Sequence, residues 1–512
     1  MENLAIIDMG SNSIRFIVMQ INDNQSYFLQ YQQKEAIRLG KGMSETGKLN
    51  PEGVKRALAC LHVYKHMMQV MQVSRCIAVA TAAARNASDG AQFIERIREE
   101  VGIDVEIISG EREAYFGYLG VVNTIDAKDF IQFDLGGASI EVSLVLNRKI
   151  KESVSVPLGA VTMTDKFGLQ DVVTQAALDK CVKYVEKRFR EMIPWAKDRC
   201  LPVIGIGGTV RNLAKMDQYK TNYQLSRVHN YIIPRDRFEP CYQAIIKSNC
   251  TRRRKFGGLS TERADIIIAG ATIARCLMEF SGGKDLIVSG CGLRDGVFYE
   301  YYGKKHGKGS PIVHDVLKAS VENYLKRVDR RMEHLERVHD LSLSLFDQLK
   351  RLHGAPARSR DLLAVAAWLH DSGKIINYYE HARNSAFIIN NAPLYGMTQL
   401  EQLKASFIAG FHHGISNKIV RSYRYAMMVT QTEWKEIRKL ATLLALAEAA
   451  DVTYEGLVTG FEAASTPEGV ALSVIAAPEA NYRAIDFEMQ SLCKQFKKEF
   501  GKPLVIVWRR HG

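Results

Sequence analysis

Short apolar runs alternate with longer amphipathic stretches over residues 1–300. The runs are rich in β-branched residues and predict strands: NLAIID, SIRFIVMQI, CIAVATAA, DVEIIS, DFIQFDLG, IEVSLVL, LPVIGIGG and DLIVSG. The stretches between them, such as 51–73 and 89–101, have apolar residues at helical spacing. This alternation predicts an α/β fold with mostly parallel sheets.

The pattern changes after a segment rich in Gly, Lys and His, GKKHGKGSP at 303–311, which predicts a linker. Helical periodicity then dominates over 312–327, 332–352, 361–370, 400–412 and 435–451. The last segment, 469–508, predicts a strand, a helix and a strand. We therefore expect two α/β domains at 1–125 and 126–305, an all-α domain at 311–460 and a small α/β domain at 466–512.

Two apolar runs end in the same kind of turn. AIIDMGSNSIRF begins at residue 5 and IQFDLGGASIEV at residue 131, so each run carries an aspartate and then a glycine turn. Such turns present backbone N–H groups to an anion, and the aspartate can hold hydrated Mg²⁺. A single turn of this kind is more often a plain tight turn. Two further glycine turns follow apolar runs, at 205–209 and 289–294, and the set favours a phosphate site at strand ends.

Composition and charge narrow the choice of partners. The apolar content of 46% and the charged content of 24% are typical of a soluble globular protein, and no apolar run approaches the ~18 residues of a membrane span. The nine cysteines form no CxxC pair, which indicates free thiols in a reducing, cytoplasmic setting. The net charge of +13 favours a polyanionic partner. Each single basic run, such as Arg252-Arg253-Arg254-Lys255, is interpreted as a solvated face.

Several segments, taken in order, resemble one family. DMGSNSIRF, TAAARNA, ISGEREAYFGYLGV, FDLGGASIEV, GIGGTVRNLA, ERADIIIAG and SGCGLRDGVFY are similar to the exopolyphosphatase/guanosine pentaphosphate phosphohydrolase (Ppx/GppA) family of the sugar kinase/Hsp70/actin superfamily. The resemblance covers residues 4–300 and implies two duplicated actin-like, ribonuclease-H-like α/β domains. The later part resembles the longer exopolyphosphatases, which implies an all-α HD-like domain and a small α/β C-terminal domain.

The resemblance also implies a set of site residues. Glu113, in SGEREA, would activate or orient the attacking water, although Arg112 stands where the family has a first carboxylate. Asp134 and Glu141 would act in catalysis and, with Asp8, hold Mg²⁺. Glu141 lies seven residues after Asp134, an odd spacing that a single flat strand would place on opposite faces, so the turn between them must reorient it. The implied phosphate-binding residues are Ser11, Asn12, Ser13, Arg85, Gly136, Gly137, Ala138, Ser139, Gly207, Gly208 and Thr209.

The helical part carries a second candidate site. His334 and the pair His370-Asp371, in WLHDSGK, resemble the HD phosphohydrolase pattern, in which imidazole and carboxylate hold a divalent metal. The later aspartate of that pattern could be replaced by Glu448 or Asp451, and His412 and His413 form a further candidate pair. Asn384, however, stands where relatives of this domain typically have histidine. The incomplete ligand set favours a degenerate HD fold that binds polyanions or forms a dimer.

These features lead to a ranked set of functions. The first is a Mg²⁺-dependent exopolyphosphatase that releases terminal orthophosphate from inorganic polyphosphate. The second is a guanosine pentaphosphate 5′-phosphohydrolase that uses the same site. A kinase would need an adenosine pocket and an acceptor base, and no sugar-binding signature is present. A non-catalytic binder of polyphosphate or guanosine tetraphosphate is disfavoured by the intact acidic set. We expect a homodimer, and we expect no nucleic acid partner.

Overall fold

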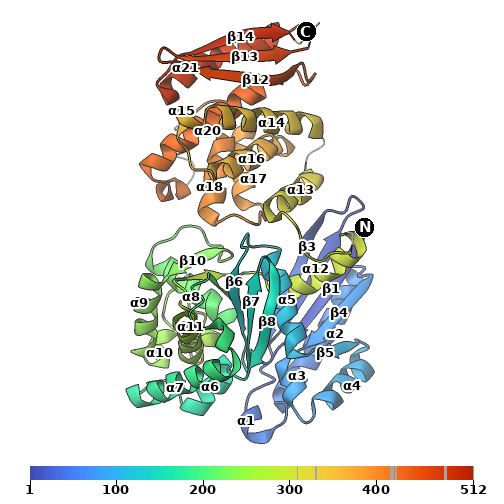
Figure 1. Ribbon diagram of the computed structural model, residues 1–512. Helices are drawn as coiled ribbons and strands as arrows, with labels where there is room; N and C mark the ends of the chain where they lie inside the picture. The colour runs from blue at the N-terminus through green and yellow to red at the C-terminus, as the bar shows by residue number, and fades with distance from the viewer. Residues whose placement is uncertain (308, 329–330, 416–419, 421–423, 478–480, 511–512) are drawn as a thin grey trace. The chain divides into compact units, whose positions relative to one another are not determined.

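The computed structural model describes residues 1–307, 309–328, 331–415, 420, 424–477 and 481–510. The chain forms two compact units, Met1–Val316 and Leu317–Gly512, which are described separately below (Figure 1). Among the residues that the structure describes, no helix combines the length and the apolar character that crossing a membrane requires.

The first unit contains two sheets with one repeated topology. The first sheet has the strand order β3-β2-β1-β4-β5, and the second has the order β10-β11-β9-β6-β7-β8. In the first sheet β1 is antiparallel to β2 and parallel to β4, and in the second β6 is antiparallel to β7 and parallel to β9. The strands are β1 Glu2–Met9, β2 Ser13–Ile21, β3 Tyr27–Ala36, β4 Arg75–Ala80, β5 Val105–Ile107, β6 Phe130–Leu135, β7 Ile140–Leu146, β8 Lys149–Val156, β9 Val203–Ile206, β10 Tyr231–Pro234 and β11 Asp285–Val288.

The repeat confirms the prediction of two duplicated α/β halves. The expectation of mostly parallel sheets is wrong, because each half begins with an antiparallel meander: β1-β2-β3 in the first and β6-β7-β8 in the second. The turns between β1 and β2 and between β6 and β7 are short, and a short turn can join only antiparallel strands. The parallel strands β4, β5, β9 and β11 follow longer connections that contain helices.

Two helices, α5 (Gly110–Val122) and α12 (Leu293–His306), pack against each other between the sheets (Figure 1). Phe116 of α5 and Val297 of α12 join the core of the first sheet, while Leu119 joins the core of the second. Glycine permits the close approach, since a Cβ on Gly296 would lie 1.9 Å from the Phe116 carbonyl oxygen. The predicted linker is wrong at its start, because α12 continues through His306.

The outer faces of the sheets are covered by the remaining helices. Helices α2 and α4 cover the first sheet, as predicted from 51–73 and 89–101, and α7, α8, α9 and α11 cover the second. Their bounds are α1 Met43–Thr46, α2 Pro51–Val70, α3 Ala82–Asn86, α4 Gly90–Val101, α6 Ala160–Phe167, α7 Gln175–Met192, η1 Pro194–Ala196, α8 Gly208–Lys220, α9 Arg235–Ile246, α10 Cys250–Arg253, η2 Thr261–Arg263 and α11 Ile267–Ser281.

One of the basic residues assigned to a solvated face is in fact structural. Arg253 is fully buried, and its guanidinium donates to the backbone oxygens of Gln170 at 2.7 Å and Ala264 at 2.7 Å, and also to those of Asp171 and Ser248. The interpretation of this run as wholly solvated is therefore wrong at Arg253, because a planar group with five donors can tie several loop carbonyls together.

The second unit is helical up to residue 449, as predicted, and ends in a small sheet. Its helix α14 packs against α16 and α20 through buried leucines. The helices are α13 Val316–Val328, α14 Met332–Gln348, α15 Lys350–His353, α16 Ser359–Leu369, η3 Ser372–Ile375, α17 His381–Asn391, α18 Gln399–Gly410, η4 Arg424–Met428, α20 Gln431–Ala449 and α21 Arg483–Phe500.

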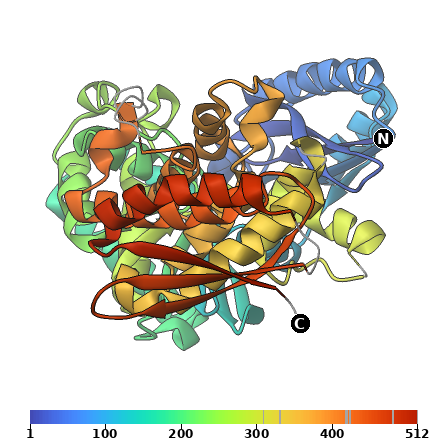
Figure 2. The same cartoon turned by 90° about the horizontal axis from the view of Figure 1, so that it is seen from above.

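The terminal sheet has the strand order β12-β13-β14, with β12 Val458–Ser465, β13 Val470–Ala476 and β14 Leu504–Arg510 (Figure 2). The predicted strand, helix and strand correspond to β13, α21 and β14. The strand β12 was missed because its sequence, VTGFEAAS, contains a glycine and few large apolar residues. It forms by pairing antiparallel with β13, which is a tertiary contact rather than a local preference.

Candidate active site

The two aspartate turns of the sequence form matching hairpins. The Gly10 amide donates to the Ser13 carbonyl oxygen at 3.1 Å, and the Gly136 amide donates to that of Ser139 at 3.0 Å. The strand register pairs Asp8 with Arg15 in the first half and Asp134 with Glu141 in the second. Residues directly opposite each other in antiparallel strands share one face. The turn therefore brings Asp134 and Glu141 to the same face, as the expected reorientation requires.

A cleft lies between these hairpins, and most of the predicted residues line it. Three others stand next to the lining: Arg85 donates to Glu113, Glu141 accepts from Ser139, and Thr209 follows Gly208 with its side chain fully buried. The predicted residues that line the cleft are Asp8, Ser11, Asn12, Ser13, Glu113, Asp134, Gly136, Gly137, Ala138, Ser139, Gly207 and Gly208.

Three helices begin at the cleft. The first residues of α6, α8 and α12 line it together with the glycines before α8 and α12. In α6 the first-turn N–H groups donate to the Gly136 and Gly137 carbonyl oxygens. The N–H groups of a first helical turn have no partner within the helix, so those of α8 and α12 can bind a phosphoryl oxygen. Gly207 has a φ of 104°, and a Cβ there would lie 2.7 Å from the Leu135 carbonyl oxygen. A glycine is therefore required for α8 to begin this close to β6.

Glu113 lies in the first turn of α5, whose N-terminus is capped by Ser109. Its carboxylate accepts from the Arg85 guanidinium at 3.2 Å, and Arg85 also donates to the Ile108 carbonyl oxygen at 2.8 Å. Burial, followed by the charges of Glu141 and Asp134, raises the pKa of Glu113 well above its usual value, and Arg85 opposes this shift. A carboxylate with a raised pKa is a good proton acceptor near neutral pH.

The pKa values of the two carboxyl groups of the second hairpin are also raised. Burial raises the pKa of Asp134 to about 6, with Arg15 opposing and the charge of Asp8 adding to the shift. Burial and the charge of Asp134 raise the pKa of Glu141 to about 7, although Ser139 and Ser155 donate to it at 2.7 and 2.8 Å. Carboxylates that repel one another in a buried site favour a divalent cation between them.

The cleft also contains arginines that the sequence analysis did not single out: Arg15, Arg211, Arg263 and Arg294. Burial and the nearby arginines lower the pKa of Arg211 to about 9, that of Arg263 to about 10, and that of Arg294 below its usual value. A half-buried group of like charges favours an anion as counter-charge, so this set is suited to bind phosphoryl oxygens. Each of these arginines lies within a segment on which the family resemblance rests. An arginine in each of four such segments was the sequence signal that could have identified them.

Comparison with known proteins agrees with this geometry. Residues 17–305 match the family model described as the Ppx/GppA phosphatase family, and residues 316–452 match Ppx/GppA phosphatase, domain III. The chain belongs to the Ppx/GppA phosphatase family. It is 25% identical over 456 residues to a guanosine-5′-triphosphate,3′-diphosphate pyrophosphatase of Aliivibrio fischeri, a match that covers 86% of this chain and 85% of that protein.

Solved structures of Ppx/GppA proteins resemble about three fifths of this chain. The Aquifex aeolicus family member matches with a TM-score of 0.53 and 29% identity, covering 60% of this chain and 99% of that one. An exopolyphosphatase from Cytophaga hutchinsonii matches with a TM-score of 0.55 and 25% identity, covering 59% of this chain and 98% of that one. The first unit therefore has the α/β fold of Ppx/GppA phosphatases.

Arg112, which stands where the family has a carboxylate, does not line the cleft. The Arg112 guanidinium donates to Glu300 of α12 at 2.6 Å and lies 4.4 Å above the Phe116 ring. It therefore joins α5 to α12, while Glu113, the next residue, faces the cleft. The helical screw separates the two side chains, so a missing carboxylate at 112 leaves the cleft intact.

The second candidate site lies in the part that matches domain III. Ligand atoms of His334, His370 and Asp371 lie within 4.8 Å of one another. Asp451 accepts from His334 at 2.7 Å and so stands behind the cluster. His381 was not predicted from the sequence; its Nε2 lies 3.5 Å from Oδ1 of Asp371, and it precedes Asn384 by three residues on the same helix. The histidine absent from position 384 is thus matched by one that lies a helical turn earlier.

Proposed function

We propose that this Ppx/GppA phosphatase is an exopolyphosphatase, which releases terminal orthophosphate from inorganic polyphosphate. The observation that carries the proposal is the cleft itself, in which half-buried arginines and helix N-termini line the same space as a group of carboxyl groups with raised pKa values. Phosphoanhydride hydrolysis needs charge neutralisation, an oriented phosphoryl group and a positioned water. This cleft can supply all three.

In this proposal each part of the cleft has one role. Arg211, Arg263 and the backbone N–H groups at Gly207 and Gly208 bind the oxygens of the terminal phosphoryl group, which orients its phosphorus. Glu113 accepts the proton of the attacking water. Arg85 holds the Glu113 carboxylate in place through its hydrogen bond of 3.2 Å and is itself a positioning residue.

The acidic residues suit the expected Mg²⁺. Mg²⁺ prefers carboxylate oxygens and water, and it usually takes only one or two carboxylates from a protein. Asp8 and Asp134 line the cleft and would hold the ion, while Glu141 lies behind them and adds negative charge. When bound, Mg²⁺ neutralises phosphoryl oxygens. Its charge would also offset the burial and the mutual repulsion that raise the pKa values of the carboxyl groups.

A second candidate function rests on a specific finding. The Aliivibrio fischeri relative is named for a guanosine polyphosphate substrate and matches most of this chain. The net charge of +13 favours the longer anion, polyphosphate, which can interact with more positive surface than a nucleotide can.

A paired assay distinguishes the two functions. Phosphate release is measured from polyphosphate and from guanosine pentaphosphate, each with Mg²⁺ and with a chelator. We expect a higher kcat/KM for polyphosphate and no release with the chelator. A higher kcat/KM for guanosine pentaphosphate would replace the proposal with the second function. Tight binding of either compound without release would indicate a non-catalytic binder.

A further inference from the structure

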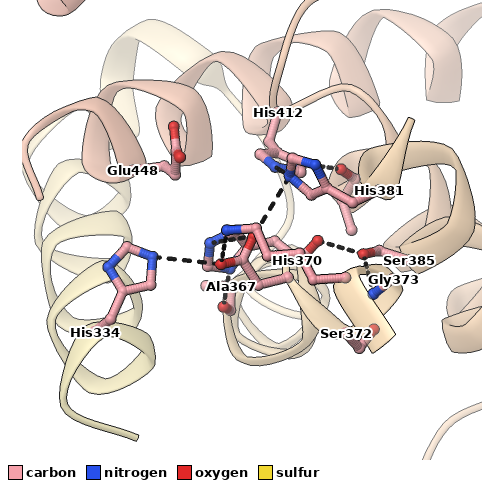
Figure 3. A network of polar contacts seen from close by, with 12 residues as sticks. His334, Ala367, His370, Ser372, Gly373, His381, Ser385, His412 and Glu448 are labelled. Atoms are coloured by element: carbon pink, nitrogen blue, oxygen red, sulfur yellow. Dashed lines mark hydrogen bonds and ion pairs between the residues drawn. The ribbon is translucent and has the colours of Figure 1, made fainter. Parts of the chain in front are cut away.

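A second cluster of polar side chains lies in the helical unit, within residues 317–512. Figure 3 shows His334 on one side of His370, and His381 and His412 on the other side. Two groups have ligand atoms that all lie within 4.8 Å of one another: His334, His370 and Asp371, and then His381, His412 and His413. Asp371 lies between the groups: its Oδ2 is 3.8 Å from Nε2 of His334, and its Oδ1 is 3.5 Å from Nε2 of His381. The cluster is thus assembled from four separate stretches of chain.

Three atoms of the first group are buried without a hydrogen-bond partner among the described residues. These atoms are Nε2 of His334, Nε2 of His370 and Oδ1 of Asp371, and their residues are at most 5% exposed. Buried polar atoms in folded proteins are nearly always satisfied, and each one left alone is costly. Three unsatisfied ligand atoms that converge on one point would all be satisfied by a single cation.

The imidazoles are oriented to present a lone pair. Nδ1 of His370, His381 and His412 lies 2.7, 2.9 and 2.6 Å from a backbone carbonyl oxygen. A carbonyl oxygen only accepts, so each Nδ1 must carry the proton, and in the neutral ring Nε2 then has a free lone pair. Nδ1 of His334 is held in the same way by the Asp451 carboxylate at 2.7 Å. Metal-binding histidines typically donate the N–H of the nitrogen that does not bind the metal, here Nδ1, to a carbonyl or carboxylate oxygen.

The contact between His381 and His412 also favours a bound cation. Their Nε2 atoms lie 3.2 Å apart, although each ring donates through Nδ1 to a backbone oxygen. Two lone pairs at this distance repel each other, and neither nitrogen can donate unless its ring is charged. A cation bound to both nitrogens removes the repulsion, and His413 is within reach to complete a third ligand.

We propose that this cluster binds first-row transition-metal ions at two adjacent subsites. The first subsite consists of His334, His370 and Asp371, and the second of His381, His412 and His413. Neutral imidazole with one carboxylate suits ions such as Zn²⁺, Mn²⁺ or Fe²⁺, whereas Mg²⁺ prefers oxygen ligands alone. The centre is therefore chemically distinct from the carboxylate site of the first unit. It also differs from the degenerate, metal-free module that the sequence favoured.

The direct test measures metal content. The full chain, without an affinity tag, is stripped with a chelator, loaded with Zn²⁺ or with Mn²⁺, dialysed and analysed by mass spectrometry for metal. We expect two ions per chain in the wild type for at least one of these metals. We expect one ion in His370→Gln and one in His412→Gln. The matched control is His339→Gln, since His339 lies on the same helix as His334 but bonds to Asp340 at the surface.

A second variant keeps the test independent of folding. Asp451→Asn leaves every proposed ligand in place but weakens the partner of the His334 Nδ1, and we expect a 10- to 100-fold loss of affinity at the first subsite. Thermal unfolding of each variant without metal checks that it is folded. Less than a tenth of an ion per chain with both metals would overturn the proposal. Unchanged metal content in a folded His370→Gln/His412→Gln protein would also overturn it.

Discussion

At the scale of single residues, Glu113 is distinguished from its neighbours by burial and by its charged surroundings. Glu111 and Glu113 both lie in the first turn of α5, yet Glu111 is exposed, whereas Glu113 faces the cleft beside Arg85. Residue type and spacing do not distinguish the two glutamates, and Glu113 was selected only through the family resemblance. Only the direction of the helix decides which of them can reach a substrate.

The first prediction concerns this residue. Glu113→Gln keeps the shape of the side chain but cannot accept a proton, so we expect kcat for phosphate release to fall by roughly 10²–10⁴-fold. Polyphosphate binding, measured by titration calorimetry with Mg²⁺, should change little. Glu111→Gln is the matched control and should retain wild-type kcat. A Glu113→Gln protein with near-normal kcat would remove Glu113 from its role.

The second prediction concerns pH and stability. Glu141 has a pKa of about 7 in the folded chain, above the usual value of 4.5. Below the usual value it is protonated in both folded and unfolded chains and contributes nothing. As pH rises through 4.5 toward 7 the unfolded chain loses this proton first, so the free energy of unfolding falls. Removing the charge should therefore stabilise the metal-free protein at neutral pH.

The measurement is the Tm in chelator between pH 4.5 and 8. We expect Glu141→Gln to match the wild type at the acidic end and to melt higher at pH 8, because the amide oxygen can still accept from Ser139 and Ser155. Glu152→Gln, an exposed residue on β8, should show no such difference. Parallel curves for the wild type and Glu141→Gln would show that the carboxyl group titrates normally.

At the scale of elements, the two hairpins differ in the charge of the residue that lies opposite the aspartate. The register pairs Asp8 with Arg15 and Asp134 with Glu141, so the two halves differ at one equivalent position. The duplicated hairpin thus supplies an aspartate from each half, while the opposing residue is a cation in one half and a carboxyl group in the other. Sequence spacing was sufficient to detect the repeat, but the strand register was needed to see this difference.

The third prediction concerns the beginning of α8. A Cβ on Gly208 would lie 2.0 Å from the Arg263 guanidinium, so Gly208→Ala must displace that side chain. We expect KM for polyphosphate to rise about tenfold, which corresponds to the loss of roughly one charge-assisted hydrogen bond. Steady-state kinetics measures the change.

A double-mutant cycle tests the cause. In an Arg263→Ala background the alanine at 208 has no guanidinium to displace, so it should add little to the KM of the single Arg263→Ala protein. Additive effects of the two substitutions would show that Gly208→Ala acts on the N-terminus of the helix instead.

At the scale of the whole molecule, the positively charged residues have different roles. Arg253 of the basic run is buried in structure, whereas Arg211, Arg263 and Arg294 are gathered in the cleft from separate segments. The net charge of +13 alone could not distinguish these roles. Arg253 is occupied by backbone carbonyl oxygens, whereas the other three line the cleft, so the folded chain decides which cations are available to an anion.

The fourth prediction is a steep dependence on salt. A polyanion releases bound counterions when it binds to cations, so log(kcat/KM) for polyphosphate should fall linearly with log salt concentration. Arg211→Gln should make the slope shallower, since one cation of the cleft is lost. Arg254→Gln, an exposed member of the basic run, should leave the slope nearly unchanged. A flat response in the wild type would contradict binding of polyphosphate through this charge.

The sequence by itself determined the features that depend on local pattern. The alternation of short runs and amphipathic stretches gave the two α/β halves, the helical periodicity gave the second unit, and the repeated Asp and Gly turns gave the duplicated hairpins. These signals are reliable because strand and helix periodicity and turn chemistry are properties of neighbouring residues. Most of the residues predicted for the cleft lie within such turns, and the structure places them around one cleft.

Tertiary structure alone decided the features that join distant segments. The strand β12 exists because β13 pairs with it, the arginines of the cleft meet from four places in the chain, and His381 joins Asp371 across a loop. Burial and mutual charge, which set the pKa values of Glu113, Asp134 and Glu141, also arise only in the folded chain. Proximity in space, unlike pattern, leaves no signal at a fixed spacing along the chain.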